Sequence, residues 1–226
     1  MPKFIGRLLC QYGFHDLQVI DSGGGVVTEW ELIYESIMSA KGRHRFIAWI
    51  KKAISAAAAT AIVCEEIYFQ TGGVLGAITM HSGGNPVPDQ ILYKWIEKLQ
   101  EVVKEGSRSP LLVGPMTMNR YQLSYDKDSE TGEVTFYPDM RGEFDLSNQN
   151  ENLVFNLTNA IHSGFADGKA NTEEELAALL DLETWHEIGT GRQVAEDWVS
   201  LCDKAAHDIP LLWQRRGYKN AGSGQA

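Results

Sequence analysis

Cysteine is scarce in this sequence, and the motifs that mark common catalytic and metal sites are missing. Cys10, Cys64 and Cys202 are far apart and form no CxxC pair, which excludes a disulfide framework and a zinc knuckle. The chain contains no GxGxxG, GKS, GKT or HExxH pattern, and each of these patterns reflects a specific ligand or metal geometry. We therefore predict that the protein uses no cofactor and no metal.

Long hydrophobic runs are also missing. The alanine-rich stretch AISAAAATAIVC, residues 53–64, has 12 residues and is flanked by Lys51, Lys52, Glu65 and Glu66. A membrane-spanning helix needs about 20 residues, so we predict no membrane contact. The N-terminal residues place a lysine and an arginine within a short apolar run and offer no small-residue cleavage site. We therefore expect a cytoplasmic protein.

The same alanine-rich stretch is a strong helical signal. Alanine is the best helix former, and its small side chain lets another helix approach closely. We predict a central helix over residues 44–69 that is buried in its middle turns. Residues 53–64 would then belong to the core or to the interface of a homo-oligomer.

The order of the other patterns predicts an α+β fold in two parts, residues 1–146 and 150–226, with a boundary at 145–152. The first part mixes strands and helices, and the second is mostly helical. Apolar and polar residues alternate around the turn at 22–25, which indicates a hairpin. The other expected elements are a helix over 31–40, a strand over 72–80, a helix over 89–104, a hairpin over 119–139, helices over 150–163, 173–183 and 191–206, a stop at Pro210 and a short strand over 209–214. The helix over 89–104 has its apolar residues on one stripe, and Thr172 with Glu175 fits the capping box of the helix over 173–183.

Positive charge is in short supply. The formal net charge is −10, which argues against a general nucleic-acid binder, because that affinity comes from lysine and arginine neutralising phosphates. Residues 151–204 carry eleven acidic and three basic side chains, a net charge of −8. Two interpretations fit, solvated helix faces or an acidic surface that competes with phosphates for a basic protein or nucleoprotein partner. The candidate binding residues are Glu173, Glu174, Glu175, Glu196 and Asp197.

The stretch ITMHSGGNPVPDQ, residues 78–90, is the nearest approach to a catalytic signature. A strand, a glycine turn and a helix start can hold an anion on backbone amides, but two prolines remove two of those amides. We therefore predict an ordinary connection, in which Pro88 beside Asp89 begins the next helix. His81 is a low-ranking candidate for a general base, and we expect it to be dispensable because no partner that would orient its ring is visible. A small hydrolase or transferase that uses His81 and the Gly83–Gly84 turn remains one functional hypothesis.

The tip of the hairpin over 119–139 has an acidic pattern. Asp126, Asp128 and Glu130 alternate like the first ligands of an EF-hand loop, but the glycine falls at 132 instead of the sixth position. No pair of helices flanks the loop, so we predict a solvated turn.

The last segment, residues 184–226, contains a tryptophan, a Gly-x-Arg turn, an amphipathic stretch and a basic end. These features are Trp185, Gly191, Arg192, Trp198, Arg215, Arg216 and Lys219. Their order resembles small winged-helix-like modules of phage and mobile-element proteins. The resemblance implies a docking or DNA-contact module, with the contacts made by Arg192, Arg215, Arg216 and Lys219.

These observations favour a non-enzymatic phage or mobile-element accessory protein that binds a protein or nucleoprotein complex. One version of this hypothesis is an acidic inhibitor of a nucleic-acid-binding complex. The first alternative is a DNA-binding regulatory protein that uses the basic C-terminal segment. DNA is the less favoured partner, because the charge of −8 over residues 151–204 would repel phosphates near that segment.

Overall fold

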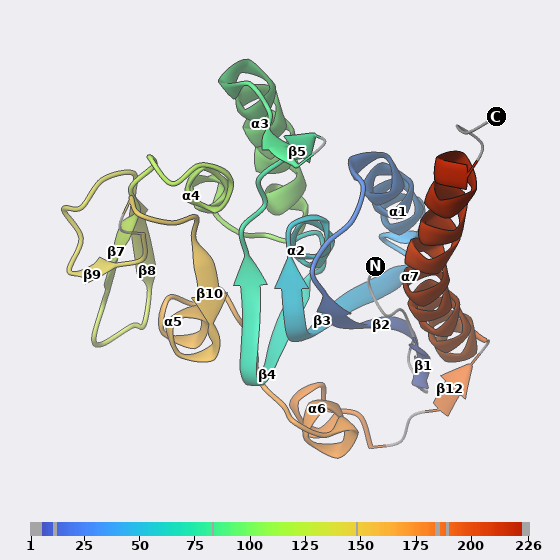
Figure 1. The fold of residues 1–226 in the computed structure, drawn as a ribbon. Coiled ribbons are helices and arrows are strands. Elements are labelled where there is room, and N and C mark those ends of the chain that lie inside the picture. Colours follow the sequence, from blue (N-terminus) through green and yellow to red (C-terminus); the bar gives the residue numbers. More distant parts are fainter. Residues whose placement is uncertain are drawn as a thin grey trace.

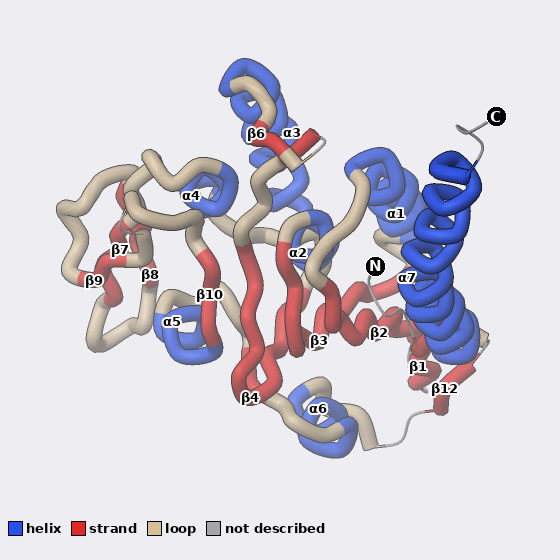
Figure 2. The backbone as a smooth tube through the Cα atoms, in the orientation of Figure 1, coloured by secondary structure: helices blue, strands red, loops and turns tan. Residues whose placement is uncertain are grey.

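The computed structural model describes residues 6–10, 13–82, 84–147, 149–183, 186–188 and 190–222. A seven-stranded sheet forms its centre, in the order β10-β4-β3-β2-β1-β12, with β11 beside β4 (Figures 1 and 2). Helices pack around this sheet, so the predicted α+β class is confirmed. The strands are β1 (Gly6–Cys10), β2 (Gly13–Ser22), β3 (His44–Ile54), β4 (Glu66–Gly76), β10 (Val154–Asn156), β11 (Gly168–Lys169) and β12 (His186–Ile188).

The remaining elements surround the sheet. The ribbon β5–β6 is a minimal antiparallel pair, and β7, β8 and β9 form a separate small sheet. These strands are β5 (His81–Ser82), β6 (Asn85–Pro86), β7 (Ser124–Lys127), β8 (Val134–Tyr137) and β9 (Phe144–Asp145). The helices are α1 (Val27–Ala40), α2 (Ala56–Ala61), α3 (Asp89–Glu105), α4 (Val113–Thr117), α5 (Leu157–His162), α6 (Glu173–Leu179) and α7 (Gly191–Gly222).

The predicted central helix over residues 44–69 is wrong in most of its length. Residues 44–54 form strand β3, only 56–61 form a helix, and 66–76 form strand β4. Strand β3 is apolar from Phe46 to Ile50 because both of its faces are covered, so it shows no alternation that would identify a strand. The predicted burial is confirmed, since the side chains of Ala57, Ala58, Ala59 and Ala61 are at most 1% exposed.

The burial of α2 lies within a single chain. Its residues belong to the main hydrophobic core, together with side chains of β3, β4, α1 and α3. The core of the single chain therefore accounts for the burial of these alanines, and the homo-oligomer contact through residues 53–64 stays a prediction.

Strands β2, β3 and β4 run parallel and determine where loops meet. Ser22 pairs with Ala53, and Ile54 pairs with Gly76, so the carboxyl ends of the three strands lie at one edge of the sheet. Helices α1, α2 and α3 lie on the opposite side of the sheet from α6 (Figure 1). Under α6, Trp49 packs in a second core with Leu176, and its indole Nε1 donates a hydrogen bond of 2.7 Å to the carbonyl of Ala170.

Local predictions outside this region have mixed outcomes. The helix over 89–104 is confirmed as α3, and the hairpin over 119–139 is confirmed as β7 paired with β8. The hairpin around 22–25 is wrong, because β2 leads directly into α1 and then pairs in parallel with β3. Strands β10, β11 and β12, which follow the predicted boundary at 145–152, join the sheet built by β1–β4.

The C-terminal segment differs from the winged-helix expectation. Residues 191–222 form one helix that contains Pro210, so neither a stop at this proline nor a strand over 209–214 is present. A proline removes one backbone hydrogen bond, which a long helix tolerates when its neighbouring turns remain intact. Trp185 lies outside the described residues. Among the described residues, none of the helices combines the length and apolar character that crossing a membrane requires.

Candidate active site

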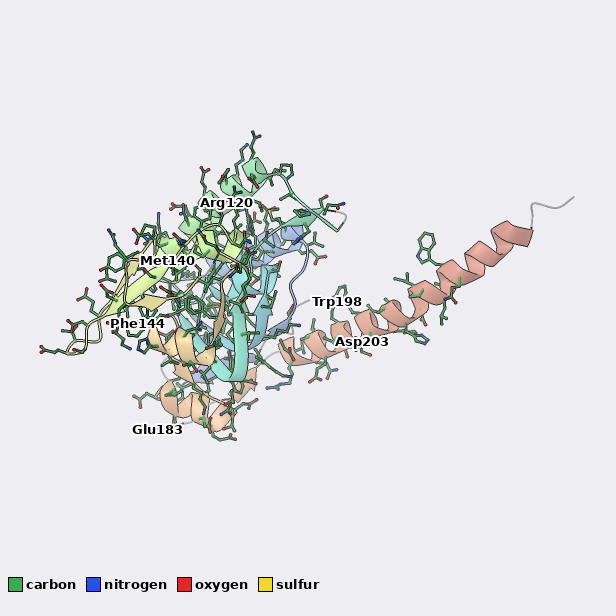
Figure 3. All side chains as sticks on the ribbon, turned by 60° about the vertical axis from the view of Figure 1, so that its left-hand side comes forward. Arg120, Met140, Phe144, Glu183, Trp198 and Asp203 are labelled. Carbon is green, nitrogen blue, oxygen red and sulfur yellow. The ribbon has the colours of Figure 1, made fainter. Side chains whose placement is uncertain are left out.

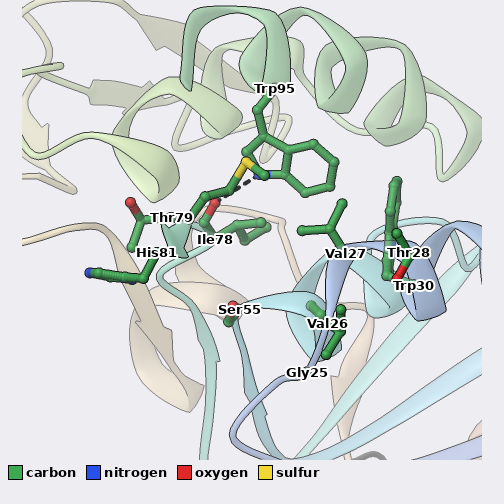
Figure 4. A pocket seen from close by; sticks show the side chains of 12 residues that line it. Gly25, Val26, Val27, Thr28, Trp30, Ser55, Ile78, Thr79, His81 and Trp95 are labelled. Carbon is green, nitrogen blue, oxygen red and sulfur yellow. Dashed lines mark hydrogen bonds between the residues drawn. The ribbon is translucent and has the colours of Figure 1, made fainter. Parts of the chain in front are cut away.

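Three segments, each directly following a parallel strand, line one cavity. They are Gly25, at the end of the glycine loop 23–25 after β2, Ser55 after β3, and residues 78–81 after β4. The cavity has a volume of about 360 Å³, and Figure 4 shows the side chains that face it. Open α/β sheets bind their ligands at the carboxyl ends of parallel strands, where successive loops diverge. This position makes the cavity the leading candidate for a binding site.

Ser55 has an unusual backbone conformation at the turn between β3 and α2. Its φ is 59° and its ψ is −126°, a region that L-residues other than glycine rarely adopt. The amide of Ser55 donates to the carbonyl of Gly76 at 3.0 Å, and the carbonyl of Ser55 accepts from the amide of Ala59 at 3.0 Å. Because backbone hydrogen bonds hold the serine on both sides, the surrounding fold imposes the strained conformation. Such strain is concentrated at functional sites.

The glycine loop approaches this serine so closely that a side chain would not fit. Gly24 has a φ of 108°, and a Cβ placed on it would lie 2.6 Å from Ser55 Cβ and 2.8 Å from the carbonyl oxygen of Ile54. The loop is held by Ser22, whose hydroxyl accepts a hydrogen bond of 3.1 Å from the amide of Gly24. Only glycine fits at position 24, because any side chain there would collide with Ser55. The close approach brings the backbone of Gly25 to the wall of the cavity.

The rest of the cavity wall is mainly apolar. Trp30 and Trp95 pack edge to face, with ring centroids 4.9 Å apart, and Val27 and Met80 lie beside them. The indole Nε1 of Trp95 donates to the carbonyl of Ile78 at 3.0 Å, the dashed line in Figure 4. This bond ties α3 to the segment that follows β4, so the two walls of the cavity are connected. A cavity with these walls suits an apolar group next to one reactive hydroxyl.

His81 lines the same cavity from strand β5 and is exposed. In Figure 4 its ring points away from Ser55. His81 pairs with Pro86 across the β5–β6 ribbon, and the amide of Val87 donates to the carbonyl of Met80, so this segment returns on itself before α3 begins. The predicted proline-led start of α3 is confirmed, with Pro88 as its N-cap. Gly83 lies outside the described residues.

Ser55, His81 and the backbone amides beside Ser55 are the kinds of group that acyl transfer requires. A serine hydroxyl on a sharp strand-to-helix turn is the geometry of a nucleophile elbow. A histidine on the same cavity can supply a general base, and backbone amides beside the serine can stabilise an oxyanion. Sequence reasoning missed Ser55, because the alanines around it read as part of a long helix. The signal that could have found it is a serine between a β-branched and aromatic run and a short alanine helix, preceded by the DSGGG turn.

The predicted acidic binding residues lie on α6, which covers the opposite face of the sheet from α1, α2 and α3, and on α7. Glu173 forms an ion pair of 3.2 Å with Arg192, so α6 and α7 are linked. Asp197 accepts a hydrogen bond from Gln193 at 2.8 Å, and Glu174 and Glu196 are exposed.

The remaining predicted residues are placed as follows. Glu175 accepts a hydrogen bond of 2.6 Å from the amide of Asn171, beside the predicted cap Thr172. Arg215, Arg216 and Lys219 belong to α7, but their side chains lie outside the described residues. A basic partner for the acidic residues stays a prediction.

The hairpin tip over residues 126–132 has the geometry of a self-contained turn. One oxygen of Asp128 accepts hydrogen bonds from the amides of Glu130 and Thr131 and from the Thr131 hydroxyl. These hydrogen bonds hold the pKa of the Asp128 carboxyl below its usual range, and the two from Thr131 have the largest effect. The described parts of the chain contain no group of three or more histidine, cysteine or acidic side chains placed to hold a metal ion.

The comparisons with known proteins bear on the fold. No family model and no curated protein matches the chain. Two solved structures of the 1510-N membrane-bound stomatin-specific protease are similar to it. One, a lysine-to-alanine variant in complex with a substrate peptide, has a TM-score of 0.53 and 16% identity over 73% of this chain and 64% of that chain. The other, a serine-to-alanine variant, has a TM-score of 0.52 and 15% identity over 73% and 68%. The chain shares its fold with a protease.

This similarity corrects the functional hypothesis drawn from the sequence. The chain spans less than two thirds of the first of these structures, so the resemblance concerns the fold. A protease fold contradicts the expectation of a non-enzymatic phage accessory protein, and nothing in the comparisons supports an inhibitor or a winged helix. The winged-helix resemblance failed because it depended on the order of a few residues, whereas residues 191–222 form one helix.

Proposed function

We propose that the protein is a serine hydrolase that cleaves peptide bonds, with Ser55 as the nucleophile. The observation that carries this proposal is the strained backbone of Ser55 at the wall of the cavity, held by hydrogen bonds on both sides. A peptide is the favoured substrate because the neighbouring fold belongs to a protease that was solved with a substrate peptide. The apolar cavity wall is compatible with an apolar side chain of such a peptide.

In the proposed reaction, the Ser55 oxygen attacks the carbonyl carbon of the scissile peptide bond while a base takes its proton. The tetrahedral oxyanion accepts hydrogen bonds from backbone amides, and those of Ala56 and Gly25 are the candidates. The C–N bond then breaks, and the proton passes to the departing amine. Water hydrolyses the resulting ester, which releases the acid and restores the serine.

His81 is the proposed base, in contrast to its expected dispensability. It shares the cavity with Ser55, although its ring has to turn toward the serine before it can accept a proton. Catalytic hydrogen bonds often align only when substrate is bound, so this orientation is compatible with the role. Lys52 is the comparison residue for assigning the base, because its ammonium lies close to the glycine loop. The ammonium is 3.9 Å from the position that a Cβ on Gly23 would take.

The proposal is tested with a fluorophosphonate probe, which forms a covalent bond with activated serines. Wild-type protein should gain one probe mass by intact mass spectrometry and should cleave an unstructured protein such as casein. Ser55→Ala should lose both properties while keeping its melting temperature, and Ser36→Ala, on the exposed side of α1, should keep both. An unlabelled wild type, or a Ser55→Ala protein that is still labelled, contradicts the proposal.

The base is assigned with a second pair of variants. His81→Ala should reduce kcat by about 10²- to 10⁴-fold, the usual contribution of a general base. Lys52→Met serves as the control and should retain most of the activity, because Lys52, unlike His81, does not line the cavity. The opposite pattern would transfer the role of base from His81 to Lys52.

We also propose a cytoplasmic location. Cys64 and Cys202 are both free thiols in the structure, which suits a reducing compartment. A fluorescent fusion expressed in the host would test this location directly.

A further inference from the structure

A second cavity lies along α3, on the side of this helix away from the candidate active site. It has a volume of about 340 Å³, and we call it the α3–α4 groove because residues of both helices line it. Its α3 residues are Tyr93, Ile96, Glu97 and Gln100, which fall within about 100° of arc on the helix. Trp95, which lines the first cavity, lies about 150° away from their centre. Helix α3 therefore separates the two cavities, and they can bind different ligands.

Two tyrosine rings of the α3–α4 groove are held in place by neighbouring residues. Tyr121 lies against α4 at Gly114, where an added Cβ would be 3.2 Å from the ring. The guanidinium of Arg120, a residue labelled in Figure 3, lies over the ring of Tyr93 at 5.7 Å from its centroid. Arg120 also forms an ion pair with Asp89 at the start of α3. Rings that are fixed in advance lose little conformational freedom when a ligand binds.

Three polar side chains on the walls of the groove have no partner within the described part of the chain. Glu97 is the one charged side chain among the described lining residues, and neither Lys94 nor Lys98 of the same helix pairs with it. The side-chain amides of Gln100 and Gln122 likewise form no hydrogen bond to another described residue. A carboxylate and two amide carbonyls are thus available as hydrogen-bond acceptors.

We propose that the α3–α4 groove binds an arginine side chain on a basic segment of a partner protein. A guanidinium carries five N–H donors, can bond to a carboxylate in a bidentate manner and stacks on aromatic faces. Glu97, the two glutamine carbonyls and the rings of Tyr93 and Tyr121 supply the matching groups. A lysine ammonium is a compact and strongly hydrated charge, so it gains less from flat rings and paired acceptors.

The rim of the groove favours a segment of a protein over free arginine. Leu111 and Tyr93 are 36% and 42% exposed, and Pro115 and Pro138 add further apolar surface. These side chains can contact the methylene groups of the arginine and the residues on either side of it. The net charge of −10 attracts a basic segment at long range and so favours its association with the protein.

NMR titration tests the proposal with a defined probe, the acetylated and amidated peptide Ala-Pro-Arg-Leu-Ala, at about 0.15 M ionic strength. Wild type and Ser55→Ala should bind it alike, so the result does not depend on the proposed hydrolase activity. The amide signals of Gly114 and Gln122 should shift and saturate. A peptide with citrulline in place of arginine keeps the shape without the charge, and it should bind about tenfold more weakly. The lysine peptide should also bind more weakly than the arginine peptide.

Two variants of α3 assign the charge that is recognised. Glu97→Gln should weaken binding of the arginine peptide about tenfold and remove its advantage over the citrulline peptide. Glu101→Gln is the matched control, because Glu101 lies about one turn further along α3, pairs with Lys104 and does not line the groove. It should leave the Kd unchanged. Equal binding of the arginine and citrulline peptides, an absence of shifts at Gly114 and Gln122, or an equal loss in both variants overturns the proposal.

Discussion

Replacing Ser55 by glycine should stabilise the fold while it removes the proposed activity. The φ of 59° and ψ of −126° at this serine are expected to cost on the order of 1–3 kcal/mol. Glycine adopts positive φ without steric penalty, but it loses more conformational freedom on folding, about 0.5–1 kcal/mol relative to alanine. Alanine keeps the strain, because it keeps the Cβ. We therefore expect Ser55→Gly to be more stable than Ser55→Ala by about 0.5–2 kcal/mol.

The measurement is a pair of thermal and guanidinium unfolding curves for the two variants. For a chain of this size, 1 kcal/mol corresponds to a shift in melting temperature of about 2–4 °C, which is readily resolved. Ser36 provides the matched control, because it lies in the interior of α1 and its hydroxyl donates a hydrogen bond of 2.7 Å to the carbonyl of Leu32. There the order should reverse, with glycine about 1 kcal/mol less stable than alanine.

The refuting result is a Ser55→Gly protein that melts at or below Ser55→Ala while the Ser36 pair behaves as expected. It would mean that the backbone at Ser55 is not strained. The argument from backbone strain for Ser55 as a nucleophile would then be lost, and only the probe labelling would decide the assignment.

Four further predictions concern close packing and burial. Gly24→Ala should destabilise the fold and abolish probe labelling, because the added Cβ collides with the backbone. Gly42→Ala is the control: Gly42 has a φ of 88° and open space around it, so this substitution should cost only about 1–2 kcal/mol. Denaturant unfolding of the two variants measures both costs. Ala57→Asp should cost about 3–5 kcal/mol, because it places a charge at a side chain that is 1% exposed, and an unchanged melting temperature would contradict this. Burial raises the pKa of the Cys64 thiol from 9.0 to about 12, so a thiol reagent at pH 8 should modify Cys202 in the folded protein and Cys64 only after unfolding. The same shift makes the contribution of Cys64 to stability complete below pH 9 and lost as the pH rises toward 12, because the unfolded chain ionises first; unfolding free energies measured at successive pH values test this direction.

Elements that depend on neighbouring residues could be predicted from the sequence. Helix α3 was found from its apolar stripe and its proline-led start, and the β7–β8 hairpin from alternation around a polar turn. The side chain of Thr172 caps α6 as expected, and Asp128 forms the expected turn. In each case the interactions that stabilise the element lie within a few residues along the chain.

The candidate site depends on contacts between distant parts of the chain. Strand β3 was mistaken for helix because a strand buried on both faces is uniformly apolar, and only its pairing with β2 and β4 identifies it. Ser55, Gly24 and His81 come together because the three parallel strands that precede them end at one edge of the sheet. The local sequence determines that each of these strands ends where it does. Which ends lie side by side is decided by the sheet, because strand order is a property of non-local hydrogen bonding and of the core that covers it.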